Sequence, residues 1–168
     1  MFLASELMFF AAFFAAYYDL RAINPVWPPR GIRLDVGPAT LGTILLGLSS
    51  LTVYLAARQF GHGTARVRSW LIATALLGAM FLAIAVRGWE RANFSISTDA
   101  YGSLFFAMTG FHALHVLAGI ILLLGLTIGL RKPAFTADHR AGAEAIMFYW
   151  HFVFVVWLGI WATIYFVR

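Results

Sequence analysis

Long apolar runs dominate this sequence, and charged residues gather in the short segments between them. The runs cover residues 1–20, 39–57, 70–86, 101–130 and 145–167. At ~1.5 Å per residue, each run is long enough as a helix to cross or nearly cross a hydrocarbon layer of ~30 Å. The runs lack the apolar and polar alternation that is typical of transmembrane β-strands. The pattern predicts an all-α fold, an integral membrane bundle of five transmembrane helices in a single domain over residues 1–168.

The composition supports a membrane environment. Hydrophobic residues make up 62% of the 168 residues, and the mean hydropathy is +0.84. That is more apolar material than a soluble domain of this length can bury. The first run lacks a basic leading segment and contains Glu6, so we interpret it as a mature span and not as a signal peptide. The absence of cysteine excludes thiolate metal sites and iron–sulfur clusters.

The net charge of +5 suggests a polyanionic partner, but the twelve Lys and Arg residues are scattered through the segments that flank the apolar runs. This distribution favours phospholipid headgroups and argues against nucleic acid. Basic residues are equally numerous at the two ends of the predicted bundle. On the N-terminal side they are concentrated in two short turns, which favours a cytoplasmic N-terminus and a C-terminus outside. Between the first two runs, Trp27 lies among several prolines, and we expect it to act as an interfacial anchor.

Titratable residues inside the apolar runs are the candidates for function, because such groups are costly in a membrane unless they have a partner or a use. His112 and His115 are one helical turn apart, so they share a face of the fourth run. His151 lies about six residues into the fifth run, which predicts an axial offset of ~10 Å from His115 in an antiparallel neighbour. This offset argues against a metal site made of the three histidines, and two histidines at i and i+3 cannot ligate opposite faces of one haem.

Glu6 is the sharpest candidate for proton chemistry. It lies about five residues into the first run, which places it ~7 to 8 Å below the surface. A carboxyl group there is expected to be protonated or paired. Three interpretations stay open: a contact with His151, a carboxylate at the helix start that reaches water, and a proton relay or antenna.

Several segments together resemble a known family. SELMFF, TILLGLSSLT, FSISTDAYGSLFF, TGFHALHV and YWHFVFVVWLGIWATIYF follow one another in the order of the signature segments of cytochrome c oxidase subunit III, a family that also serves quinol oxidases. The resemblance implies a non-catalytic subunit of a respiratory haem-copper terminal oxidase, which supports stability, proton uptake and sustained turnover. It also implies that haem and copper lie in the partner subunits I and II, and that this chain holds no metal, no redox cofactor and no catalytic residue. The high ratio of arginine to lysine suggests a bacterial plasma membrane.

The resemblance also implies roles for particular residues. Glu6 matches the family's membrane-embedded, carbodiimide-reactive glutamate, and the family's motif histidines and glutamate correspond to His112, His115, His151 and Glu90. Longer members have seven helices and bind phospholipid in a cleft. This chain begins where their third helix begins, so we expect that cleft only if a neighbouring subunit supplies the missing wall.

Four positions depart from the family pattern. Phe154 stands where an aspartate is expected, Gly42 where an asparagine is usual, Arg87 where a glutamine is usual, and Arg91 where a tyrosine often occurs. Phe154 removes a buried carboxylate, so the family's polar contacts around the fifth helix cannot be transferred to this chain.

Small residues predict where helices approach closely. Gly125 and Gly129 form a GxxxG motif, and the second run contains Gly42, Gly47, Ser49 and Ser50. We expect these residues to serve packing within the chain, and close contact with a neighbouring subunit is the alternative. Two other functions stay open: the accessory subunit of a nitric oxide reductase, and a small proton-coupled transporter. The YWHFV and FSISTDAYGS segments favour the oxidase, and the sequence shows none of the inverted repeats that are typical of a transporter.

Overall fold

The computed structural model describes residues 2–59, 64–131 and 140–167. These residues form five helices, α1 (Phe2–Ile23), α2 (Val36–Arg58), α3 (Thr64–Arg91), α4 (Ala100–Gly129) and α5 (Arg140–Tyr165). All five are long and apolar enough to cross a membrane. The predicted all-α architecture with five spans is confirmed.

Two helices extend well beyond the apolar runs that predicted them. α3 begins at Thr64 instead of residue 70, and α5 begins at Arg140 instead of residue 145. A span needs only about 20 residues to cross the hydrocarbon core, so polar residues can continue a helix into the headgroup region. The longer α5 places His151 about twice as far from the helix start as the sequence predicted.

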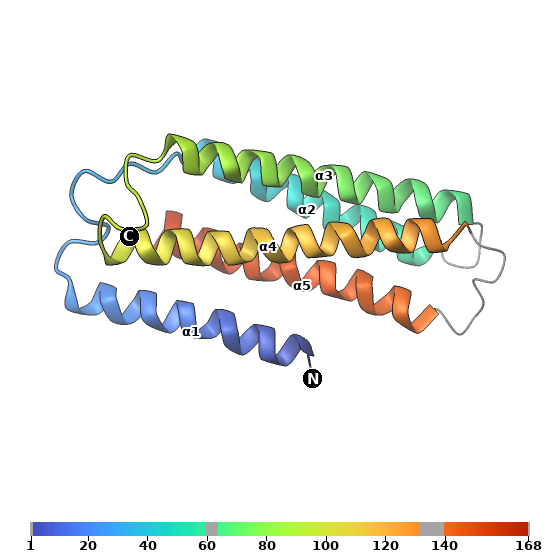
Figure 1. The fold of residues 1–168 in the computed structure, drawn as a ribbon, viewed down its shortest axis with the longest axis horizontal. Coiled ribbons are helices and arrows are strands. Elements are labelled where there is room, and N and C mark those ends of the chain that lie inside the picture. Colours follow the sequence, from blue (N-terminus) through green and yellow to red (C-terminus); the bar gives the residue numbers. More distant parts are fainter. Residues whose placement is uncertain (1, 60–63, 132–139, 168) are drawn as a thin grey trace.

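Helices α2 to α5 form the body of the bundle, and α1 lies outside it. Helices α2, α3, α4 and α5 form a closed ring in which each packs against two neighbours, whereas α1 packs only against α4 and α5 (Figure 1). In the apolar window of α1, 11% of the residues are buried, against 28–39% in the other four helices. The attachment of α1 therefore depends on few contacts, which gives weight to its polar contacts, among them the hydrogen bond of 3.3 Å between Tyr18 and Thr163 of α5.

One indole joins the four helices of the ring. Trp150 of α5 lies directly against Gly78 of α3 and Gly119 of α4. Its Nε1 donates a hydrogen bond to Ser49 Oγ of α2 over 2.9 Å. The close packing predicted for the second run is confirmed, because Gly42 lies against Phe81 of α3.

Two further small-residue positions, Gly47 and Gly125, differ from each other in their surroundings. Gly47 of α2 lies against the ring of Phe154, so the departure at position 154 fills space with an aromatic side chain. A Cβ at Gly125 would meet nothing within 4 Å. The expectation that Gly125 packs within the chain is therefore wrong, since α4 turns this residue away from the ring.

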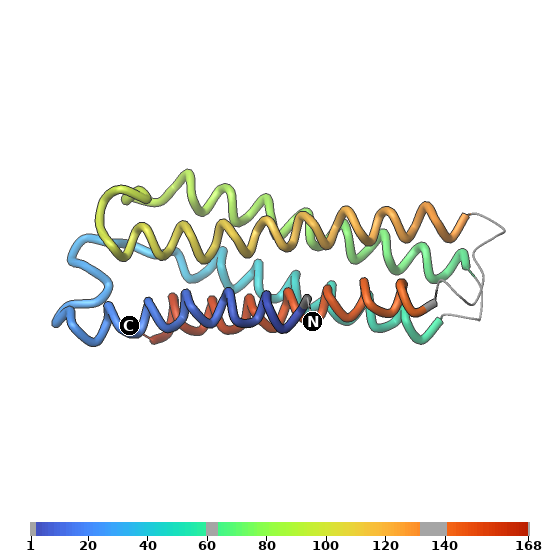
Figure 2. Tube along the Cα trace, turned by 60° about the horizontal axis from the view of Figure 1, so that its bottom comes forward, coloured from blue at the N-terminus to red at the C-terminus, as the bar shows by residue number. Residues whose placement is uncertain are grey.

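Two connections and the end of α5 lie at the same end of the bundle (Figures 1 and 2). Asn93 joins the connections, because its Nδ2 donates to Gly31 O over 2.7 Å and its Oδ1 accepts from Arg33 N over 3.2 Å. Trp27 packs edge to face against Tyr17 of α1 and Tyr101 of α4, with ring centroids 5.5 and 5.1 Å away. This end of the bundle is thus held by aromatic contacts and by hydrogen bonds between the Asn93 side chain and the backbone of the other connection.

Candidate functional site

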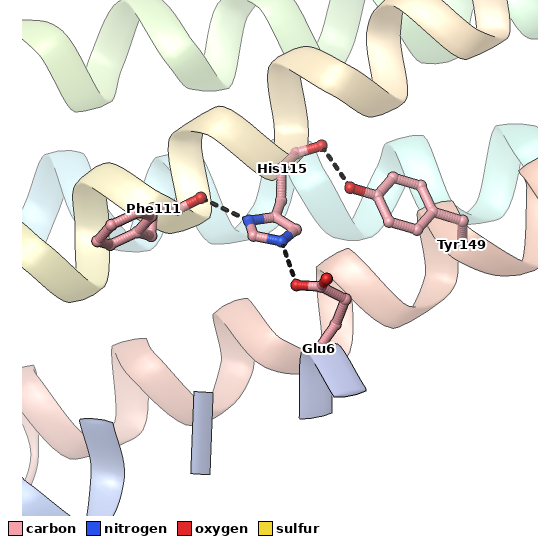
Figure 3. A network of polar contacts seen from close by, with 4 residues as sticks. All are labelled: Glu6, Phe111, His115 and Tyr149. Carbon is pink, nitrogen blue, oxygen red and sulfur yellow. Dashed lines mark hydrogen bonds and ion pairs between the residues drawn. The ribbon is translucent and has the colours of Figure 1, made fainter. Parts of the chain in front are cut away.

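A carboxyl group and an imidazole meet between α1 and α4. Glu6 Oε2 lies 2.8 Å from His115 Nε2 (Figure 3). His115 is halfway along α4, so the pair lies deep in the span. The two side chains are only 16% (His115) and 20% (Glu6) exposed. Glu6 therefore lies deeper than the sequence predicted, and it has a partner there.

The hydrogen bond of the second ring nitrogen of His115 determines which protonation states the pair can adopt. Nδ1 lies 2.7 Å from the carbonyl oxygen of Phe111, which can only accept, so Nδ1 carries a hydrogen (Figure 3). Nε2 then either accepts a hydrogen bond from a neutral Glu6 carboxyl group or, in a charged imidazolium, donates a hydrogen bond to a Glu6 carboxylate. In both states one proton lies between the two side chains, and the pair has no net charge.

A third helix contributes to the site through Tyr149. Its hydroxyl group donates a hydrogen bond to the backbone oxygen of His115 over 3.1 Å (Figure 3). The rings of Phe9 and Phe10 lie 6.4 and 5.1 Å from the imidazole, centroid to centroid. Because this surrounding is apolar, separating the charges of the pair is costly, and the hydrogen bond between the two side chains is correspondingly favoured.

His112 has a different neighbour from His115. Its Nε2 donates to Val153 O of α5 over 3.1 Å, and its ring centroid lies 5.0 Å from that of Trp157. Residues three apart on a helix are rotated by about 60°, so two side chains on one face can still meet different helices. His112 is 1% exposed and joins α4 to α5, which is a packing role.

His151 does not contact Glu6. Its Nδ1 is hydrogen-bonded to Ser50 Oγ of α2 at 2.5 Å, while Glu6 is bonded to His115. Of the three interpretations of Glu6, the contact with His151 is wrong, because α5 turns His151 towards α2, and α1 makes no contact with α2. The signal that the sequence offered was depth alone, and depth does not fix the direction of a side chain around its helix axis.

The described residues contain no group of three or more His, Cys, Asp or Glu side chains that could hold a metal ion. The axial offset predicted between His115 and His151 does not explain why the histidines form no metal site. Tyr149, two residues before His151, already reaches the backbone of His115. The histidines are separated by the directions in which they point. Glu90 is exposed near the end of α3, away from the pair.

The sequence analysis missed Tyr149 and Ser50 as partners of the two histidines. Tyr149 stands in the same YWHFV segment as His151, and Ser50 stands in a pair of serines within an apolar run. Polar residues inside a span were the available signal, but their partners depend on helix rotation.

The fold and this partly buried pair define an integral membrane protein with five spans, in which the polar groups join helices within the bundle. The family model for cytochrome c oxidase subunit III matches residues 1–168. The chain is 42% identical to a probable cytochrome c oxidase subunit 3 of Nocardia farcinica, covering 99% of this chain and 84% of that protein. It is 41% identical to cytochrome c oxidase subunit 3 of Corynebacterium diphtheriae (100% and 85%) and 34% identical to that of Thermostichus vulcanus (98% and 83%). The chain belongs to the cytochrome c oxidase subunit III family, a membrane component of the respiratory chain.

Proposed function

We propose that this chain is the non-catalytic subunit III of a haem-copper terminal oxidase, and that the pair of Glu6 and His115 supports proton uptake and sustained turnover. The partners are oxidase subunits I and II, which hold the haem and copper, together with membrane phospholipid. The observation that carries the proposal is the 2.8 Å contact between Glu6 and His115 deep in the span. A carboxyl group kept at such a depth is costly unless it is used or paired, and here the partner is itself titratable.

The geometry suits a group that holds and exchanges a proton. The proton can lie on Glu6 Oε2 or on His115 Nε2 without movement of either side chain, because the two atoms are already at hydrogen-bond distance. The pair is a local proton store beside the catalytic subunit, and it needs no continuous path across this chain.

A Glu6→Gln variant of the complete oxidase tests this role. Glutamine keeps the size of the side chain and can donate a hydrogen bond to His115 Nε2, but it cannot release a proton. We expect slower proton uptake, measured with a pH dye during single turnover, and fewer turnovers before the enzyme inactivates. Glu90→Gln is the matched control, because Glu90 is an exposed carboxylate outside the pair. Normal uptake and a normal turnover lifetime in Glu6→Gln would refute the proposed role.

Co-purification tests the assignment of partners separately. The tagged chain, extracted in mild detergent, should carry oxidase subunits with it, and their haem should appear in the optical spectrum. A preparation without haem and without oxidase subunits contradicts the assembly, whatever the behaviour of Glu6.

We propose a cytoplasmic N-terminus in a bacterial plasma membrane. The chain has no cysteine, so a single introduced cysteine reports its own side of the membrane. Ser97→Cys, between α3 and α4, should react with a membrane-impermeant maleimide in intact cells. Thr64→Cys, at the start of α3, should react only after the cells are permeabilised. The reverse pattern contradicts this orientation.

A further inference from the structure

A cavity of about 200 Å³ lies between α2, α3, α4 and α5, at the end of the bundle where Asn93 joins the two connections. Its inner wall is apolar and includes the buried rings of Phe81, Phe105 and Trp157. Two of these rings, Phe81 and Trp157, already pack edge to face, with centroids 4.7 Å apart. The wall therefore offers further aromatic faces and edges to a group that enters the cavity.

The mouth of the cavity is positively charged. Arg33, Arg87 and Arg91 line it, and all three residues are exposed. Asp35 is the one carboxylate in the lining, and Glu90 is exposed on α3 outside it. Within the part of the chain that the structure describes, none of the three guanidinium groups forms an ion pair with an acidic side chain. Guanidinium donors at the mouth are thus available to an anionic partner.

Helix electrostatics explain only part of this charge. Arg87 and Arg91 lie in the last turns of α3, where the helix dipole favours a cation. They are also four residues apart, so they share a face and repel each other. Arg33 belongs to a different connection, and Asn93 holds it at the mouth by accepting a hydrogen bond from its backbone N–H over 3.2 Å. The fold thus gathers a third cation where two already repel, which an anionic partner would relieve.

The walls of the cavity are held in place. Trp89 and Thr109, which both line it, are joined by a hydrogen bond of 3.1 Å between the indole Nε1 and the hydroxyl oxygen. Asn93 also donates to Gly31 O over 2.7 Å, which ties the two connections at the mouth. Binding sites are commonly preformed in this way, since ordering the wall in advance reduces the entropic cost of binding.

The size and position of the cavity indicate what kind of group it takes. Its volume of about 200 Å³ is below the ~300–1,000 Å³ of sites that enclose a whole drug-sized ligand. A hole of this size suits one large side chain, and such anchors supply much of the binding energy at protein interfaces. The mouth lies at helix ends, since Asp35 is the N-cap of α2 and Arg91 is the last residue of α3. A polypeptide outside the hydrocarbon core can therefore reach it.

We propose that this cavity docks an acidic segment of a partner polypeptide, which inserts one aromatic side chain into the hole. The ring packs against the aromatic inner wall, and the Asp or Glu residues that flank it pair with the three arginines at the mouth. Guanidinium groups bind carboxylates in a bidentate manner, so the charges at the mouth fix the segment in one position. The docking does not depend on the proton role of Glu6, and either proposal can fail without the other.

Photo-crosslinking in membranes that contain the complete oxidase tests the proposal. A diazirine amino acid replaces Gly88, which is exposed, lines the cavity and has nothing within 4 Å of an added Cβ. Because a diazirine reacts with lipids and polypeptides alike, the product identifies the occupant. We expect a crosslinked polypeptide in which mass spectrometry places the bond in a segment with an aromatic residue between acidic residues. Gly142 is the control position, since it is equally open and lies near the start of α5.

The arginines are tested by the yield of this product. The double variant Arg87→Gln, Arg91→Gln should reduce the yield roughly three- to tenfold, since each exposed pair with a carboxylate contributes modestly to binding. The matched control is Arg66→Gln with Arg131→Gln, two exposed arginines at the opposite end of the bundle. An unchanged yield in the first double variant would overturn the proposal. A product made only of lipid, a crosslinked segment without acidic residues, or no polypeptide product at position 88 would do the same.

Competition by a synthetic peptide separates the aromatic anchor from simple charge attraction. The probe is an acetylated and amidated peptide of sequence Asp-Glu-Phe-Glu-Asp, and in excess it should suppress the crosslink from position 88. A matched peptide with alanine in place of phenylalanine should need a roughly tenfold higher concentration, because it leaves the hole unfilled. Inorganic phosphate at the same ionic strength should leave the crosslink in place. Equal competition by the two peptides, or displacement by phosphate, contradicts the inserted side chain.

Discussion

Trp150 of α5 and Gly78 of α3 pack so closely that a Cβ at position 78 would lie 2.6 Å from the indole ring. The indole cannot move away freely, because its Nε1 is bonded to Ser49 and its other edge lies against Gly119. Contact between these helices therefore depends on the absence of a side chain at position 78.

Gly78→Ala should destabilise the protein by about 1–3 kcal/mol through overpacking. Thermal release of this chain from the purified oxidase, followed by loss of its band on a native gel, measures the effect. Gly110→Ala is the control, because its Cβ would meet nothing within 4 Å and alanine favours a helix. An equal stability of the two variants contradicts the packing described for Trp150.

Ser49→Ala should also weaken the bundle, for a different reason. The substitution removes the acceptor for Trp150 Nε1 and leaves this buried N–H without its hydrogen bond, at a cost of about 1–3 kcal/mol. Ser69→Ala is the control, since Ser69 is exposed on α3 and bonds only to a backbone oxygen of its own helix. The same thermal assay distinguishes them, and a Ser49 variant as stable as the Ser69 variant speaks against a stabilising role for this bond.

The hydropathy pattern was sufficient to predict five helices, because each apolar run must satisfy its own backbone within the membrane. The hydropathy pattern underestimated the lengths of α3 and α5, because polar residues that continue a helix beyond the hydrocarbon core leave no apolar signal. Glu6 and His115 were both identified as candidates. Their contact was not predicted, because it depends on how α1 is rotated against α4 and on how far along the bundle α1 lies.

A cavity lined by Arg33, Gly42 and Arg87 also shows that the sequence alone does not reveal which distant residues come together. The sequence identified Arg87 and Arg91 as unusual, but residues 33, 42 and 87 are far apart in the chain. They line one space only because the connections return to the same end of the bundle. The chemistry of single residues could thus be predicted from the sequence, and their grouping required the fold.

The contact between Glu6 and His115 should contribute to the attachment of α1. Because α1 packs only against α4 and α5, removal of the contact should increase hydrogen–deuterium exchange in residues 2–23. A double-mutant cycle with Glu6→Gln and His115→Phe isolates the pair, and we expect a coupling energy of about 0.5–2 kcal/mol. A cycle with His151→Phe in place of His115→Phe is the control, since His151 is bonded to Ser50. Additive effects in the first cycle would show that the two side chains act independently.

Asn93→Ala should loosen the end of the bundle without unfolding it. The substitution removes both hydrogen bonds that join Gly31 and Arg33 to the connection between α3 and α4. Because these bonds are exposed, the loss of stability should be small, about 0.5–1.5 kcal/mol for each bond. Limited proteolysis after Arg30 or Arg33 should become several-fold faster, since local opening governs cleavage of such connections. Asn24→Ala is the control, because Asn24 bonds only to Leu20 O at the end of its own helix. If both variants are cleaved at the rate of the unmodified protein, Asn93 does not hold the two connections together.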